Sequence, residues 1–72
     1  ISANEISIME TIRTLAKGLE NETEIFAAVD QMQDNIGKHS FAEKYNAFIQ
    51  SVANHITIFA PFIPALSALL TK

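Results

Sequence analysis

The sequence predicts an all-α fold: a small antiparallel bundle of three helices plus a short fourth helix at the C-terminal end. Three observations lead to this prediction. Helix-start signals occur at three places, apolar residues recur at intervals of three and four after each start, and the two glycines stand where the first two helices should end. A chain of 72 residues is long enough for one domain, so we expect residues 1–72 to fold as a single helical unit.

The first helix is predicted over residues 3–17. Ser2 and Glu5 have the spacing of a capping box, in which the serine side chain accepts from the backbone and the glutamate reaches back to the serine amide. The apolar stripe that follows includes Ile12 and Leu15. Gly18 then offers a left-handed residue that ends the helix.

The second helix is predicted over residues 22–36. Asn21 is its expected cap, and acidic residues in its first turn suit the helix dipole. The apolar stripe of this helix contains Val29 and Met32, and Gly37 closes it. Because the connections on both sides are short, we expect neighbouring helices to run antiparallel.

The third helix is predicted to be the longest, over residues 41–60. It begins with a capping box formed by Ser40 and Glu43, and its apolar stripe continues as far as Phe59. We expect it to be the spine of the fold. The core is predicted to consist of Phe48, Val52 and Ile56 from this helix, packed against Ile12, Leu15, Val29 and Met32.

Two prolines separate the third helix from the fourth. Pro61 has no amide hydrogen and disfavours helical geometry at Ala60, so the third helix should stop or kink there. Pro64 suits the first turn of a short fourth helix, in which Leu66, Leu69 and Leu70 make the apolar side.

Composition argues against several classes of function. The chain has no cysteine, so it can form neither a disulfide nor a thiolate metal site. Its net charge is −3 and its five basic residues do not cluster, so we expect no binding to nucleic acid. His39 and His55 have no further histidine or cysteine to complete a zinc site. His39 and Glu43 could share one helix face, but two ligands do not make a metal site, and no serine, threonine or acid is placed to make His55 a catalytic base. We therefore expect no catalytic, metal or cofactor site.

The most informative pattern is a gap in the charge. After Lys44 the sequence contains no Asp, Glu, Lys or Arg until Lys72. The outer face of a surface helix normally carries such residues, whereas the centre of a protein interface is depleted in them. The outer face of the predicted third helix is instead polar and neutral. The residues that we predict to bind a partner are Asn46, Gln50, Asn54, Thr57 and Phe62. The alternative is a solvated face that merely lacks charge.

A second interpretation of the C-terminal part is membrane contact, because Ile56–Leu70 is dense in apolar residues. This run has roughly 15 residues, whereas a helix that spans a bilayer needs about 20. Pro61 and Pro64 interrupt it, and the basic face common in interfacial helices is missing. These features favour a place in the core or in a protein interface.

The sequence thus predicts a non-catalytic helical module for protein interaction or assembly, whose partner is another protein chain or a second copy. The alternative is a membrane-active or lipid-binding helical protein, such as a toxin-like fragment, that inserts the segment Ile56–Leu70. The first residue is Ile1, so we also expect a processed product or a part of a longer protein.

Overall fold

The computed structural model describes residues 3–71, which form helices joined by short loops. The first three helices are α1 (Ala3–Ala16), α2 (Glu22–Asp34) and α3 (Phe41–Ser51). A run of short helical turns follows, which we call the C-terminal segment (Ala53–Thr71). Its turns are η1 (Ala53–His55), α4 (Ile56–Phe59), η2 (Ala60–Phe62), α5 (Ile63–Ala68) and η3 (Leu69–Thr71), where η denotes a 3-10 helix. The residues described contain no strand, and the predicted all-α bundle is confirmed.

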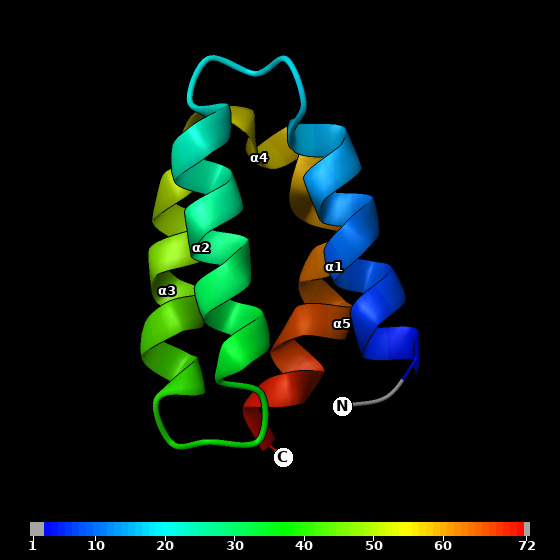
Figure 1. Cartoon of the computed structure of the whole chain (residues 1–72), viewed down its shortest axis with the longest axis vertical. Helices are drawn as coiled ribbons and strands as arrows, with labels where there is room; N and C mark the ends of the chain where they lie inside the picture. The colour runs from blue at the N-terminus through cyan, green and yellow to red at the C-terminus, as the bar shows by residue number, and fades with distance from the viewer. Residues whose placement is uncertain (1–2, 72) are drawn as a thin grey trace.

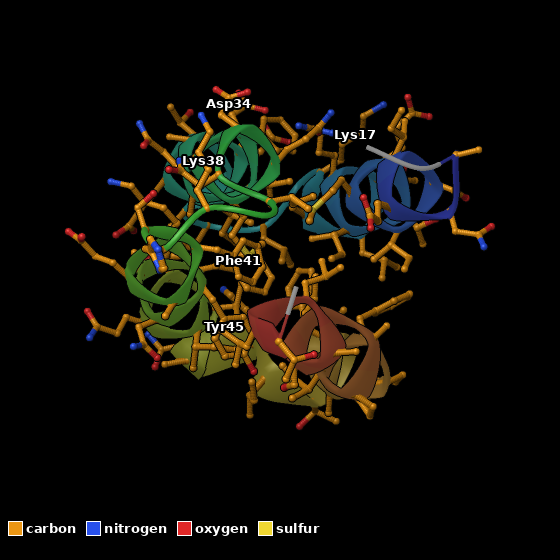
Figure 2. The ribbon with its side chains drawn as sticks, turned by 90° about the horizontal axis from the view of Figure 1, so that it is seen from below. Lys17, Asp34, Lys38, Phe41 and Tyr45 are labelled. Atoms are coloured by element: carbon orange, nitrogen blue, oxygen red, sulfur yellow. The ribbon has the colours of Figure 1, made fainter. Side chains whose placement is uncertain are left out.

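The helices pack as an antiparallel bundle with two layers. In Figure 1, α1 runs to the first loop, α2 returns beside it, α3 runs back, and α5 descends behind α1. Viewed along the bundle in Figure 2, α1 and α2 make one layer, and α3 and the C-terminal segment make the other. The loops at residues 17–21 and 35–40 are too short to allow any but antiparallel neighbours. The molecule measures 31 × 22 × 19 Å.

Both glycines end helices as predicted. Gly18 and Gly37 have φ of +83°, a left-handed conformation that other residues rarely adopt. No atom lies within 4 Å of a Cβ built at either position, so each glycine is required by its backbone conformation and not by crowding. The first two helices begin at the predicted residues, and they end at Ala16 and Asp34, within two residues of the prediction.

The side-chain caps differ from the prediction. Asn21 precedes α2 as expected, but its side chain makes no bond to the amides of that helix. Its amide group donates instead to the carbonyl oxygen of Ser51, at 2.6 Å, near the end of α3. Ser40 makes no capping bond either, because its hydroxyl donates to the side chain of Asn35. The cap predicted for Ser2 lies outside the described residues.

The predicted third helix over residues 41–60 is wrong at its C-terminal end, because α3 stops at Ser51. In a continuing helix the Ser51 carbonyl would accept from the amide of His55, four residues on. Here the Ser51 carbonyl accepts from the Asn21 side chain. The His55 amide donates instead to the carbonyl oxygen of Val52, at 2.8 Å. The backbone at Val52 accordingly leaves helical geometry, with φ of −105° and ψ of 10°. A hydrogen bond from a distant loop therefore coincides with the end of α3.

Because α3 ends early, it is shorter than predicted, and the helical turns of the C-terminal segment begin earlier than predicted. α3 has 11 residues against 14 in α1, so the prediction that the third helix is the longest is wrong. Helical turns resume at Ala53 and not after the prolines. The prolines act as predicted: α4 ends at Phe59, just before Pro61, and Pro64 lies in the first turn of α5.

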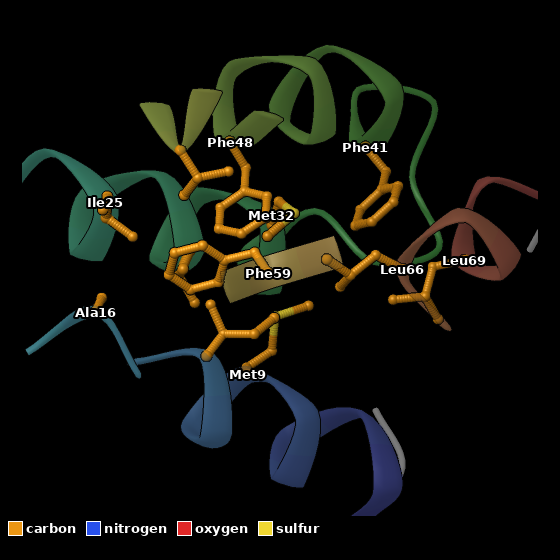
Figure 3. Close-up of a cluster of buried hydrophobic side chains, with 12 residues drawn as sticks. Met9, Ala16, Ile25, Met32, Phe41, Phe48, Phe59, Leu66 and Leu69 are labelled. Atoms are coloured by element: carbon orange, nitrogen blue, oxygen red, sulfur yellow. The ribbon is translucent and has the colours of Figure 1, made fainter. Parts of the chain in front are cut away.

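A single cluster of apolar side chains fills the space between the two layers (Figure 3). The rings of Phe48 and Phe59 meet edge to face near its middle, with their centroids 5.9 Å apart. Leu66 and Leu69 close the cluster from the C-terminal segment. The cluster consists of Met9, Ile12, Ala16, Ile25, Val29, Met32, Phe41, Phe48, Val52, Phe59, Leu66 and Leu69.

Five of the seven predicted core residues belong to this cluster, but Ile56 and Leu15 do not. Ile56 is 40% exposed, because the turns after the non-helical residue Val52 do not continue the phase of α3, whereas Phe59 from the same predicted stripe is buried. Leu15 is 37% exposed, since it lies at the margin of the buried stripe of α1. Both side chains were predicted to be in the core, and both predictions are wrong.

Polar contacts join the two helices of the first layer. Arg13 on α1 donates to the carboxylate of Asp30 on α2 at 2.6 Å, and to the side-chain oxygen of Gln33 at 2.7 Å. The two partners of the ion pair are 28% and 64% exposed, so water screens it. Packing, and not this pair, accounts for most of the attachment of α1 to α2.

Candidate interaction surface

Charge is confined to one part of the fold. Between Lys44 and Lys72 the chain has no Asp, Glu, Lys or Arg, and this stretch covers most of α3 and the whole C-terminal segment. In Figure 2, Lys17 and Asp34 lie on the layer formed by α1 and α2, away from the C-terminal segment. We call the exposed side chains of residues 45–71 the neutral surface. They are Asn46, Ala47, Gln50, Ala53, Asn54, Ile56, Thr57, Ile58, Ala60, Pro61, Pro64, Ala68, Leu70 and Thr71.

The predicted partner-binding residues lie on several elements of this part of the chain. Asn46 and Gln50 are on α3, Asn54 is in η1 and Thr57 is in α4, and all four are exposed. The expectation that they share one continuous helix face is wrong, because α3 ends before Asn54. Phe62, in η2, is half-buried and packs against the core. Their role in binding a partner stays a prediction.

Large apolar side chains interrupt these polar residues. Ile56, Ile58 and Leu70 are 40%, 41% and 43% exposed, which makes them the most exposed large apolar residues in the described chain. The sequence did not single out Ile58, and it placed Ile56 in the core. It also placed Leu70 on the apolar side of the fourth helix with Leu66 and Leu69, but only Leu66 and Leu69 are buried. Helical periodicity could have found Ile56 and Ile58 only if the break at Val52 were known, because the break decides which side of the later turns faces inward.

The C-terminal segment is held firmly enough to present these side chains from a fixed backbone. The hydroxyls of Tyr45 on α3 and Ser67 on α5 are 3.0 Å apart and form a hydrogen bond. Figure 2 shows the Tyr45 side chain directed toward the segment. Phe59 anchors the same segment in the core against Phe48. A surface that is already ordered loses little conformational entropy on binding.

A shallow polar pocket of about 370 Å³ lies beside the junction of α3 and η1. It is lined by Glu20, Asn21, Glu24, Asn54 and His55. Glu24 accepts a hydrogen bond from the Asn21 side chain at 3.1 Å, which is the same amide group that reaches the end of α3. The lining contains no hydroxyl or thiol that could act as a nucleophile. Within residues 3–71, no three histidine or acidic side chains are grouped so that they could hold a metal ion.

The C-terminal segment is also long and apolar enough, by length and composition, to cross a membrane. It has 19 residues and a mean hydropathy of 1.5. This is longer than the run of roughly 15 residues read from Ile56–Leu70, because the helical turns already begin at Ala53. In the fold, however, the segment supplies Phe59, Leu66 and Leu69 to the core.

The neutral surface can form apolar contacts and neutral hydrogen bonds, but it has no carboxylate, ammonium or guanidinium group for an ion pair. This combination of apolar and uncharged polar groups is typical of the centre of a protein interface. Comparison with models of protein families, with curated proteins and with solved structures found no match.

Proposed function

We propose that this chain is a non-catalytic helical module that binds another protein chain through its neutral surface. One observation carries the proposal: Ile56, Ile58 and Leu70 are each about two-fifths exposed on a stretch without any charged residue. Apolar area left in water costs free energy that a protein partner would recover, at about 25 cal/mol per Å². A partner that covers this surface would also have no buried charge to desolvate.

The contrast with the first layer supports the proposal. Exposed positions of α1 and α2 carry Glu10, Glu24, Asp30 and Asp34, as expected for helices in contact with water. Exposed positions of the C-terminal segment carry Ile, Thr, Ala, Pro, Asn and Leu instead. The layer of α1 and α2 and the C-terminal segment thus have different surfaces, and only the C-terminal segment resembles an interface in composition.

Membrane contact is the second candidate, favoured by the length and hydropathy of the C-terminal segment. Its insertion across a bilayer would withdraw Phe59, Leu66 and Leu69 from the core. The apolar side chains that they cover, such as Phe48 and Met9, would then be left in water, at a cost of about 25 cal/mol per Å² of exposed area. Insertion at the membrane surface usually uses a basic face, which residues 45–71 lack. These costs favour the protein partner.

Site-specific photo-crosslinking tests the proposal. A photoreactive amino acid replaces Ile58 on the neutral surface or, as a matched control, Ile6 on α1. Ile6 is also an exposed isoleucine, 36% exposed against 41% for Ile58, but it belongs to the charged layer. After illumination in the cells that make the protein, we expect protein adducts from position 58 and few from position 6.

The adducts distinguish the possible results. A protein adduct specific to position 58 supports the proposed function. Lipid adducts at position 58 would support membrane contact instead. Equal labelling at positions 58 and 6, or no adduct at either position, would show that the neutral surface is in contact with water and would refute the proposal.

A further inference from the structure

Resting on the proposed function, we infer that the partner is a second copy of this chain, and that two copies pair through the C-terminal segment about a two-fold axis. In such a dimer the same surface of each copy meets its own counterpart. The surface must therefore be complementary to itself. Three features of the chain agree with self-complementarity. They are the chemistry of its polar residues, the placement of its charged residues and the dimensions of the C-terminal segment.

The polar residues of the neutral surface can pair with one another across a two-fold axis, where residue i of one copy meets residue j of the other. The side-chain amides of Asn46, Gln50 and Asn54 each contain both a donor and an acceptor, and so does the hydroxyl of Thr57. Two copies of such a group can hydrogen-bond to each other across a two-fold axis. A carboxylate only accepts and an ammonium group only donates, so either one would repel its copy. Residues 45–71 contain only the first kind of polar group, apart from His55.

The placement of charge favours the same occupant. The chain has a net charge of −3, so two copies repel if their charged layers meet. Pairing through the C-terminal segment keeps the layer of α1 and α2, with Lys17 and Asp34, on the outside of the dimer (Figure 2). A different partner for an acidic protein would gain from basic residues opposite acidic ones, but the neutral surface has no acidic residue to attract them. Self-pairing needs no such attraction.

The dimensions of the segment are sufficient for a stable dimer. A standard interface buries about 800 Å² on each partner, which is roughly a fifth of the 4340 Å² accessible surface of this chain. The segment has 19 of the 72 residues, so at average exposure it contributes roughly 1,100 Å². The segment crosses one end of the bundle at α4 and then runs back behind α1 as α5, so two copies could meet along α5 (Figure 1).

Sedimentation velocity and light scattering on the purified chain test this inference. At about 100 μM we expect a particle of twice the 7.9 kDa chain mass, dissociating on dilution. Ile58→Glu should raise the dissociation constant by at least about 30-fold, because it brings two carboxylates into a desolvated contact. Ile6→Glu is the matched control and should leave the dimer unchanged. Circular dichroism should show the same helicity in all three proteins, since both positions are exposed.

Three results would overturn the inference of a dimer. In each case, the adducts formed at position 58 show whether the proposed function fails as well. A monomer at about 100 μM, or equal weakening by both substitutions, would rule out this dimer. If position 58 then still crosslinks to a different protein, the neutral surface binds another partner and the proposed function stands. A monomer that floats with phosphatidylcholine vesicles and yields only lipid adducts would refute both proposals.

Discussion

Truncation of Phe48 to alanine would test the packing of this bundle most directly. Its side chain is fully buried, and its ring meets that of Phe59 with centroids 5.9 Å apart and planes at 85°. Removing a buried phenylalanine side chain costs about 3–5 kcal/mol, from lost burial and the cavity left behind. About 0.5–1.5 kcal/mol of this reflects the aromatic pair itself. A domain of this size has a stability near the lower end of about 5–15 kcal/mol, so Phe48→Ala should barely fold.

Urea denaturation followed by circular dichroism, at one chain concentration for all variants, measures this loss. Phe48→Leu keeps most of the apolar volume and should lose only about 1–2 kcal/mol, so it gives a measurable transition if the alanine variant is unfolded. Leu15→Ala is the control, because this side chain is 37% exposed and its truncation should cost about 1 kcal/mol. A loss of under about 1 kcal/mol for Phe48→Ala, or no more than for Leu15→Ala, would refute the assignment of Phe48 to the centre of the core.

Further substitutions test individual contacts. Asn21→Ala should cost about 1 kcal/mol in urea denaturation, because it removes the hydrogen bond to the end of α3; an unchanged midpoint would mean that the bond contributes nothing. Gly37→Ala should cost about 1–2 kcal/mol through its φ of +83°, since a new methyl group would meet no atom; equal or greater stability would contradict this conformation. Arg13→Ala should cost at most about 1 kcal/mol, and less in high salt, whereas a larger loss insensitive to salt would show that the side chain acts through packing. Gln50→Glu should weaken association of the chain at least about tenfold with unchanged helicity, whereas unaltered sedimentation would place Gln50 in solvent.

Local sequence was a good guide to where helices begin and where glycine ends them. The starts of α1, α2 and α3 agree with the prediction, as do the left-handed conformations of Gly18 and Gly37. Each of these features depends on residues within one or two turns, so short-range patterns contain the necessary information. The prolines acted locally in the same way.

The errors arose where a contact from a distant part of the chain replaced a local one. Asn21 was expected to cap α2, but its amide reaches Ser51 in the other layer. That contact lies where α3 ends early; the following turns have a different phase, and Ile56 is exposed. Apolar periodicity alone could not find this change, because the pattern from Phe41 to Phe59 is compatible with one unbroken helix.

The candidate surface was predicted in part. The gap in charge is a property of the sequence, and it located Asn46, Gln50, Asn54 and Thr57, which the structure leaves exposed. The apolar part of the surface required the fold, because Ile56 and Phe59 share one predicted stripe and only the three-dimensional packing leaves Ile56 in solvent. Composition thus identified the region, while tertiary packing identified which of its apolar side chains a partner could contact.

The hydrogen bond from Asn21 to Ser51 has a consequence for how the chain folds. It joins residues 30 positions apart, so it can form only after the turn between α1 and α2 has docked on α3. We predict that this contact forms after the transition state, so its loss in Asn21→Ala should speed unfolding and leave the folding rate nearly unchanged. In an isolated peptide of residues 41–60 the Ser51 carbonyl would be free to accept from His55. Any helix that this peptide forms should then continue through Val52, which is a break in the intact protein.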